Sequence, residues 1–373
     1  MKRHMSHIPD IRLFPKAYWP NAQITRRQIL KLASAVGLSL LRIDALAQSS
    51  DVQIMLESRA ILDEGLHWVV KSSSERGTDR LCERIKRAGF NVFVPNVWHG
   101  RGATWPTNLA PWDDRFPQPL GFDPLHHLIE TAKRYELEVH PWFNVGLRQR
   151  EFFPEFTARK GSESFDFHNP AFRDFIVNLI LDVVEKYPIH GINLDFVRFS
   201  SPRPGFDTVQ EAAVGEVVRR VSRQAKSINP KLVVSVDAAP WLPAIKQYGQ
   251  DAPKWADEGF VDVIYSMQYQ YSPNFEIIRQ IQSKMQRPET MVVMVGNFDR
   301  VGPQQKVVPR DPKRLCELID ESRTVSMNRG VALYLYGLLS EEQIDLLQKT
   351  VFRVPAKPHW GLGPRTPEDV RVE

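Results

Sequence analysis

The stretch GINLDFVRF at 191–199 places two charged side chains, Asp195 and Arg198, inside an apolar run. Burying a charge costs free energy unless the charge is paired or used. A second carboxylate, Asp237, directly follows the apolar run VVSV. Two carboxyl groups in different surroundings can divide acid and base roles, because burial raises one pKa and a nearby cation lowers the other. We predict an ionised Asp195 beside Arg198, and an Asp237 acid with a raised pKa on an apolar strand near Trp241. A purely structural Asp195–Arg198 ion pair is the alternative.

Aromatic and polar side chains recur where the apolar runs end. Indole and phenol rings stack on the apolar faces of sugar rings, and amide, imidazole and guanidinium groups can hydrogen-bond hydroxyls. The predicted substrate-binding residues are Arg198, Asn96, Trp98, His140, Trp142, Asn144, Trp241, Gln268, Tyr269 and Tyr336. The tryptophans could instead be core residues, and His140 could be a hydrogen-bonding residue at a strand end. Together with paired carboxylates, these residues indicate cleavage of glycosidic bonds.

Strands and helices that alternate along the chain would position these residues. Apolar, β-branched runs predict strands at 59–65, 91–98, 137–143, 191–199, 231–241, 261–269, 290–298 and 330–337. Amphipathic segments, several with capping residues, predict helices at 78–90, 123–136, 169–187, 209–228, 252–259, 274–286, 312–327 and 340–351. Eight such pairs are typical of a (β/α)8 TIM barrel, whose active site lies at the C-terminal ends of the strands. Asp195 would then face this rim.

An open, doubly wound α/β sheet is the competing fold. It is disfavoured because no G-x-G-x-x-G follows the first strand. We therefore predict a single barrel domain at 48–353, followed by a Pro-rich tail at 354–373 that wraps on the surface. The long loops after the second and third strands are expected to be functional.

The first 47 residues have the features of an export signal. TRRQILK precedes the short apolar stretch LASAVGLSLL, and ALA at 45–47 supplies small residues for cleavage after Ala47. The paired arginines match the twin-arginine pattern, which predicts the twin-arginine translocase as export partner and a periplasmic or secreted mature protein. A short buried helix is the alternative. No other segment is apolar for long enough to span a membrane.

Charge and cysteine content exclude several classes of protein. Residues 1–47 hold eight of the 49 Lys and Arg but two of the 44 Asp and Glu, which leaves 41 basic and 42 acidic residues in the body. A body without a basic run is not expected to bind nucleic acid. Two cysteines, Cys82 and Cys316, exclude a disulfide scaffold and a four-cysteine zinc site, and leave one disulfide open. No metal-ligand motif occurs, so we expect neither a metal nor a cofactor.

Four segments resemble the bacterial glycosyl-hydrolase-like 10 family. They are PNVWHGRGATWP, LEVHPWFN, GINLDFVRF and VDVIYSMQYQY, and the resemblance covers roughly residues 54–350. It departs from the family pattern at Phe196, where tyrosine is usual, and at Ser266, where proline is usual. Asn144 stands where an acid in relatives could be the proton donor, in which case this chain would use Asp237 instead.

The resemblance implies a TIM-barrel glycoside hydrolase with Asp195 as its catalytic carboxylate and Arg198 as its neighbour. The family includes a divisome-localised hydrolase of peptidoglycan glycan strands, so a cell-envelope or extracellular polysaccharide is the expected substrate, with peptidoglycan glycan first. A catalytically inactive carbohydrate-binding barrel is the main rival, with the same aromatic rim. A metal-dependent polysaccharide deacetylase is disfavoured because its ligand motif is missing.

Overall fold

The structure is a computed structural model, and the residues that it describes are 54–69, 77–116, 120–149, 152–157, 163–199, 208–239, 247–327 and 329–362. The predicted leader and Trp241 lie outside these residues.

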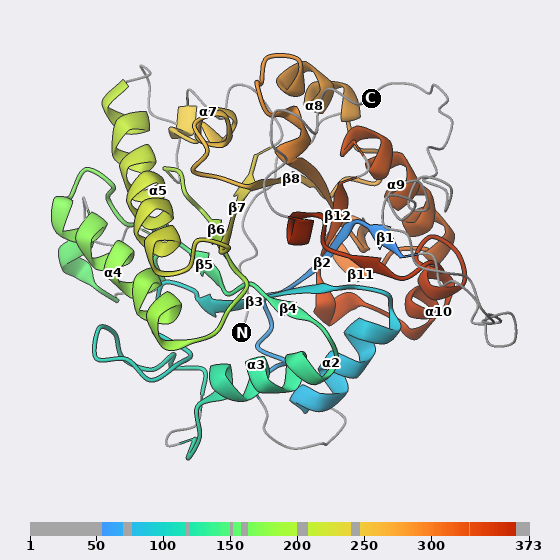
Figure 1. Ribbon diagram of the computed structural model, residues 1–373, viewed down its shortest axis with the longest axis horizontal. Coiled ribbons are helices and arrows are strands. Elements are labelled where there is room, and N and C mark those ends of the chain that lie inside the picture. Colours follow the sequence, from blue (N-terminus) through green and yellow to red (C-terminus); the bar gives the residue numbers. More distant parts are fainter. Residues whose placement is uncertain are drawn as a thin grey trace, which may run out of the picture.

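A closed ring of parallel strands forms the centre of the molecule (Figure 1). The ring closes because β2 (Ser58–Asp63) pairs with both β3 (Val92–Trp98) and β12 (Gly330–Tyr334). The other strands of the ring, in order from β3, are β4 (Glu138–Val139) with β5 (Trp142–Asn144), β6 (Gly191–Asp195), β7 (Val233–Ala238), β8 (Val263–Gln268) and β9 (Met291–Gly296). The predicted (β/α)8 barrel is confirmed.

In the described ranges, eight α-helices surround this ring (Figure 1). They are α2 (Thr78–Arg87), α3 (Pro124–Arg134), α4 (Pro170–Lys186), α5 (Thr208–Ile228), α7 (Ala252–Asp257), α8 (Phe275–Gln282), α9 (Pro312–Val325) and α10 (Glu341–Lys349). Several begin at an Asp or Asn whose side chain accepts backbone N–H groups of the first turn, as Asp123 and Asn169 do. Proline at the first helical position follows both of these caps.

Strand residues alternate between two apolar layers. One layer fills the barrel interior and includes Ala60, Leu62, Val92, Val94, Val233, Val263, Tyr265, Val292, Met294 and Ala332. The other layer packs against the helices and includes Ile61, Phe93, Ile192, Val234, Ile264, Val293 and Leu333. Because successive strand side chains point to opposite faces, membership of a layer also tells which residues can reach the mouth of the barrel.

Two strands end earlier or break where the sequence predicts continuous runs. The strand predicted at 191–199 ends at Asp195, because Phe196 adopts a left-handed φ of 51° that no strand can contain. The strand predicted at 137–143 is divided into β4 and β5 around Pro141, which has no N–H for the sheet. The end of β6 therefore coincides with the predicted catalytic carboxylate.

Four short strands are additional to the predicted set. A hairpin of β10 (Phe298–Val301) and β11 (Lys306–Pro309) follows β9, and β1 (Met55–Leu56) pairs with β13 (Ala356–Lys357). Trp360, in the 3-10 helix η4 (His359–Leu362), packs against the interior layer of the barrel. The first part of the predicted tail is thus joined to the barrel rather than only wrapped on its surface.

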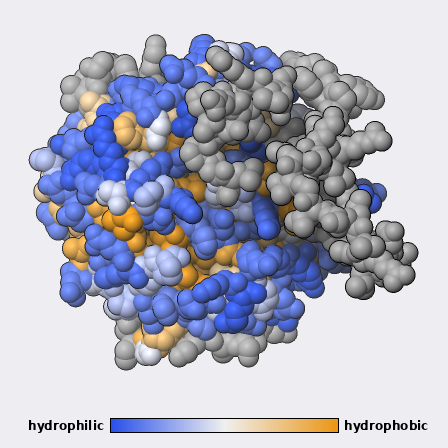
Figure 2. All heavy atoms as spheres, in the orientation of Figure 1, coloured by the Kyte–Doolittle hydropathy of each residue, from blue (hydrophilic) through white to orange (hydrophobic). Residues whose placement is uncertain are grey.

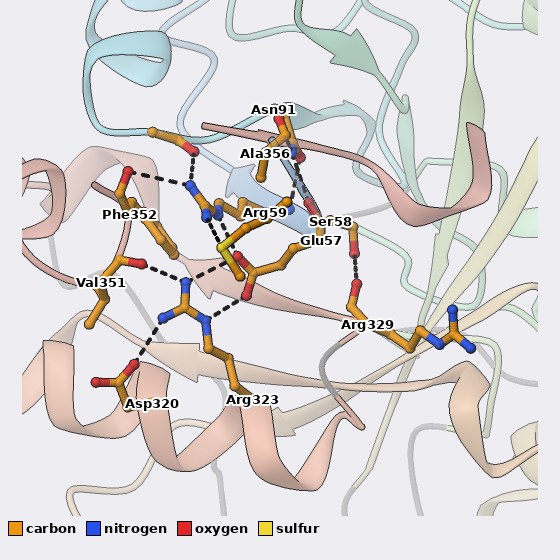
Figure 3. Close-up of polar contacts among 12 residues, drawn as sticks. Glu57, Ser58, Arg59, Asn91, Asp320, Arg323, Arg329, Val351, Phe352 and Ala356 are labelled. Atoms are coloured by element: carbon orange, nitrogen blue, oxygen red, sulfur yellow. Dashed lines mark hydrogen bonds and ion pairs between the residues drawn. The ribbon is translucent and has the colours of Figure 1, made fainter. Parts of the chain in front are cut away.

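A buried ion network joins the segment before β2 to α9 and to the segment after α10 (Figure 3). The Glu57 carboxylate accepts from Arg59 Nε at 2.6 Å and from Arg323 Nε at 2.6 Å and Nη2 at 3.0 Å. Arg323 also donates to the carbonyl of Val351, and the Arg59 guanidinium lies 4.4 Å from the centre of the Phe352 ring. Burial alone would raise the pKa of Glu57, but the hydrogen bonds and charges of the two arginines outweigh it and hold the pKa below its usual range.

Figure 2 shows a face on which hydrophilic residues predominate and apolar residues are exposed in small groups, as is ordinary for a globular domain. Among the helices of the described ranges, none combines the length and the apolar character needed to cross a bilayer. Cys82 and Cys316 are both buried free thiols, so the disulfide that the sequence left open is not formed.

Candidate active site

Asp195 and Asp237 lie side by side at the C-terminal end of the barrel. Leu194 of β6 pairs with Val236 of β7, so the next residue of each strand is also a neighbour. Adjacent strands are about 4.8 Å apart, so the backbone positions that carry the two carboxyl groups are direct neighbours. Asn193 fixes the inner face of this pair, because its amide donates to Asp237 Oδ1 at 2.9 Å and to Ser235 Oγ at 3.0 Å.

The turn after β6 binds the carboxylate of Asp195. The left-handed conformation of Phe196 directs its own N–H to Asp195 Oδ1 at 2.6 Å. Arg198 Nη1 lies 3.4 Å from the same oxygen, and the guanidinium lies 4.4 Å from the centre of the Phe196 ring. A bulky residue with positive φ is uncommon and costly, so the turn that binds the carboxylate is strained.

Burial separates the acidities of the two carboxyl groups. The Asp195 side chain is buried, which raises its pKa, although the charge of Arg198 and the Phe196 N–H oppose this effect. Asp237 is 1% exposed, and burial together with the charge of Asp195 raises its pKa well above its usual range. Only the Asn193 amide and the charge of Arg198 oppose that rise. Asp237 therefore keeps its proton at a higher pH than Asp195 does.

A polar wall faces this pair from the neighbouring strands. Asn144 is the register partner of Asp195, and its amide nitrogen lies 2.6 Å from His99 Nδ1. His99 Nε2 lies 3.8 Å from Glu64 Oε1, and Asn96 Nδ2 lies 3.4 Å from Asn144 Oδ1. Burial, followed by the charges of nearby arginines, lowers the pKa of His99 to about 3, so His99 is neutral near pH 7.

Aromatic rings complete the mouth. Tyr269 and Tyr334 stack with ring centroids 4.9 Å apart, and Trp142 packs edge-on against Tyr334 at 6.3 Å. The hydroxyl of Tyr334 donates to Glu64 Oε2 at 2.5 Å. The mouth thus combines three carboxyl groups with aromatic faces and amides, which can hold a polyhydroxylated ring and protonate an ether oxygen.

Several buried polar atoms under the mouth have no hydrogen-bond partner within the described protein. They are Asn96 Oδ1, Trp142 Nε1, Asn193 Oδ1 and Tyr265 Oη. Leaving a buried polar group unsatisfied costs free energy, so such atoms are suited to hydrogen-bond a ligand. In the part of the chain that the structure describes, no three His, Cys, Asp or Glu side chains come together as a metal site.

The structure brings seven of the predicted site residues to the mouth, namely Asp195, Asp237, Arg198, Asn96, Asn144, Trp142 and Tyr269. Four others lie elsewhere, and Trp241 is outside the described residues.

Trp98 and His140 are corrections to the predicted substrate-binding set. A register shift in β3 between Asn96 and Trp98 turns Trp98 away from the interior. Trp98 is fully buried between Phe153 and Phe175. His140 faces the barrel interior, but it lies deeper than the mouth. There its Nε2 lies 3.2 Å from Glu138 Oε2, and its ring packs against Trp360.

Gln268 and Tyr336 are also corrections. Gln268 is the residue after the interior-facing Met267, so strand alternation turns it to the outer face. Tyr336 lies after β12 in a short 3-10 helix and packs against His67 and Phe93 on the helix side of the barrel.

Sequence reasoning left Glu64, His99 and Tyr334 out of the chosen set, although each stands at the end of a predicted strand. Asp63 and Glu64 are adjacent, and only one can face the mouth. Asp63 instead binds its own turn, accepting from the N–H groups of Gly65 and His67. Strand alternation would have identified Glu64 as the residue that faces the mouth. Leu62 belongs to the interior layer, and the side chain two residues later points to the same face.

Comparisons with known proteins support this architecture. The PgaB (BpsB) glycoside hydrolase domain of Bordetella bronchiseptica superposes with a TM-score of 0.57 at 13% identity, covering 79% of this chain and 98% of that one. The spore cortex-lytic enzyme SleL of Bacillus megaterium QM B1551 superposes with a TM-score of 0.53 at 12% identity, covering 82% and 76%. At these identities the similarity establishes the fold.

Sequence relatives are named as glycosyl hydrolases. Glycosyl hydrolase DigH of Escherichia coli K12 is 21% identical over 297 residues, which are 61% of this chain and 66% of that protein, slightly under two thirds. Glycosyl hydrolase YngK of Bacillus subtilis 168 is 26% identical over 136 residues, 31% of this chain and 26% of that protein. The sequence model described as glycosyl hydrolase-like 10 matches residues 63–160, which include β3, β5 and the wall residues His99 and Asn144. This chain is thus similar to glycosyl hydrolases, and its first barrel strands match the glycosyl hydrolase-like 10 model.

Proposed function

We propose that this protein is an exported glycoside hydrolase that cleaves O-glycosidic bonds in a cell-envelope or extracellular polysaccharide, with peptidoglycan glycan strands as the first candidate. The observation that carries the proposal is the Asp195–Asp237 pair, two neighbouring carboxyl groups of different acidity at the mouth of the barrel. Glycoside hydrolysis needs such a pair of carboxyl groups around the scissile bond.

The acid role belongs to Asp237 in this proposal. Its raised pKa favours the protonated form, which can donate its proton to the glycosidic oxygen as the C–O bond breaks. Asp195, held by Phe196 and Arg198, attacks the anomeric carbon and forms a glycosyl ester. Water then hydrolyses the ester, with Asp237 returning as the base. Two carboxyl groups on adjacent strands favour the short separation of retaining enzymes over the wider one of inverting enzymes, so we propose net retention at the anomeric carbon.

Three observations support a polysaccharide substrate. The stacked Tyr269 and Tyr334 rings suit the apolar face of a sugar, and the unsatisfied Asn96 and Trp142 atoms suit its hydroxyl groups. Relatives named glycosyl hydrolases and a fold shared with a spore cortex-lytic enzyme favour cell-wall glycan. The twin-arginine pattern at 25–31 supports export through the twin-arginine translocase to the periplasm or beyond.

The proposal is tested with purified mature protein and its Asp195→Asn variant. Both are incubated with peptide-free glycan strands and a small panel of polysaccharides, and the products are identified by mass spectrometry. We expect cleavage by the wild type and a loss of several orders of magnitude in kcat for the variant, since removing a catalytic group that acts as part of a unit has effects of that size. Asp237→Asn and Glu64→Gln, assayed in parallel, identify the partner of Asp195.

Binding of a glycan with no cleavage by the wild type would contradict hydrolysis and favour a carbohydrate-binding barrel. In that case the Asp195–Arg198 contact at 3.4 Å would be a structural ion pair. Cleavage by Asp195→Asn at the wild-type rate would also overturn the proposed mechanism. A larger loss from Glu64→Gln than from Asp237→Asn would move the acid or base role to Glu64.

A further inference from the structure

One aromatic side chain outside the mouth is strongly exposed. The large apolar or aromatic residues exposed in the described ranges are Ile54, Leu56, Leu109, Ile228, Tyr271, Val301 and Met327. Tyr271 is the most exposed of these at 59% and the only aromatic. Scattered exposed apolar residues are normal and need no explanation. Tyr271 differs because of the way in which it is held.

Two arginines fix the segment that carries Tyr271. Arg314 of α9 donates from Nε and Nη2 to the Tyr271 carbonyl at 3.3 and 3.1 Å, and its guanidinium lies 5.4 Å from the centre of the Tyr271 ring. Arg310, which is 1% exposed, donates to the carbonyls of Tyr269 at 3.1 Å and Phe298 at 2.9 Å. The Arg310 guanidinium also lies 5.8 Å from the Tyr271 ring. The backbone that carries the exposed ring is therefore held by hydrogen bonds, and two guanidinium groups lie beside the ring.

The position of Tyr271 relates it to the mouth. Tyr269, two residues earlier, stacks on Tyr334 inside the mouth and packs against Phe298 of the β10–β11 hairpin. The chain then leaves β8, so Tyr271 stands outside the mouth on the same side of the barrel. Aromatic faces thus continue from the buried site to the outer rim along one short segment.

The charges around Tyr271 are balanced. Asp299 lies 2.9 Å from Arg310, and Glu317 and Glu321 lie 3.0 and 3.3 Å from Arg314. Because Arg310 and Arg314 are already paired with carboxylates, the surface around Tyr271 attracts an anionic group only weakly. It offers an aromatic face whose exposed side can stack on the C–H face of an uncharged sugar ring.

We propose that Tyr271 forms a distal subsite that binds an uncharged unit, a hexose or N-acetylhexosamine, of a long glycan whose cleaved bond lies over Asp195. This inference rests on the proposed function for the position of the cleaved bond, but the stacking itself does not require cleavage. The subsite would make the enzyme favour long chains over short ones. Because the backbone of Tyr271 is already held by Arg314, ordering this segment costs little conformational entropy on binding.

The test measures binding of β-linked N-acetylglucosamine oligomers, from the disaccharide to the hexasaccharide, by isothermal titration calorimetry. Wild type, Tyr271→Ala and Tyr271→Phe are compared, with Leu109→Ala as a matched exposed control. We expect the ratio of hexasaccharide to disaccharide affinity to fall roughly tenfold in Tyr271→Ala, the size of one aromatic contact. Tyr271→Phe, which keeps the ring, should retain the wild-type ratio, and Leu109→Ala should also retain it.

An unchanged ratio in Tyr271→Ala would overturn the subsite, as would a wild type that binds none of the oligomers. Cleavage of glycan is followed in the same samples, which separates the two proposals. Binding with the expected ratio but without cleavage would leave the subsite standing and refute hydrolysis. Cleavage with no effect of Tyr271 on the ratio would refute the subsite alone.

Discussion

At the scale of single residues, the two neighbouring carboxyl groups work against the stability of the fold. A carboxyl group whose pKa is raised in the folded protein contributes stability below its unfolded pKa and loses that contribution as the pH rises through the folded value. For Asp237 the raised pKa is due first to burial and then to the charge of Asp195. The folded protein therefore tolerates a proton on Asp237 better than a charge.

We predict that Asp237→Asn stabilises the folded protein at high pH while it abolishes cleavage. Asparagine is isosteric and uncharged, so the variant should gain free energy of unfolding over the wild type as the pH rises above the ordinary aspartate value and through the raised pKa. Urea unfolding from pH 4 upward measures this difference. A difference between the two proteins that does not change with pH would contradict the assigned pKa direction.

Some of the site residues could be predicted from the sequence, and others could not. Asp195, Asp237 and Asn144 could be found because each is polar and lies at the end of an apolar run. Trp98 could not be excluded, since the register shift that turns it outward leaves no mark in the residue types. His140 is on the correct face, but its depth depends on where Pro141 interrupts the strand.

At the scale of elements, the loops after β5 and β6 are packed backbone to backbone. Val145 N–H donates to the carbonyl of Asp195 at 2.8 Å, and Gly146 N–H donates to that of Phe196 at 3.0 Å. A Cβ added to Gly146 would lie 2.6 Å from the Phe196 oxygen and 3.0 Å from the Arg198 oxygen. The position of Arg198 thus depends on a glycine in a different loop.

We predict that Gly146→Ala lowers kcat by as much as about a hundredfold, because a displacement of about 1 Å near the reacting groups can cost that much. Global stability should fall by only about 1–3 kcal/mol, as is usual for overpacking. The control is Gly121→Ala, at a positive φ of 68° with open space around it, which should lose stability but not activity. Wild-type kcat in a folded Gly146→Ala protein would show that this loop does not position the site.

The helices and the order of the elements could be predicted because caps, amphipathic periods and apolar runs all agree along this chain. The β10–β11 hairpin could not be predicted from the sequence, because its strands are short and half of the strand residues are exposed. That hairpin supplies Phe298 and the contacts of Arg310, so the outer part of the site could not be placed from sequence.

At the scale of the whole molecule, Glu57 connects the segment before β2 to α9, late in the chain. Glu57 is 1% exposed and pairs with both Arg59 and Arg323. We predict that Glu57→Gln lowers the free energy of unfolding by about 3–5 kcal/mol, because two arginines would lose their buried partner. Denaturant unfolding measures the loss. Glu276→Gln, which removes an exposed ion pair with Arg279, should change stability by less than about 1 kcal/mol. Equal effects of the two variants would refute the special role of Glu57.

The pairing of β1 with β13 also places these two strands relative to the mouth of the barrel. Both strands lie at the end of the barrel where the ring strands begin, because β1 directly precedes β2 and β13 is its parallel partner. Asp195 and Tyr271 lie at the opposite end. A linker, a bead or a fused partner joined ahead of Ile54 or behind Leu362 would therefore approach from the rear of the barrel. The mouth would point away from the support and toward an insoluble polymer presented in front of it.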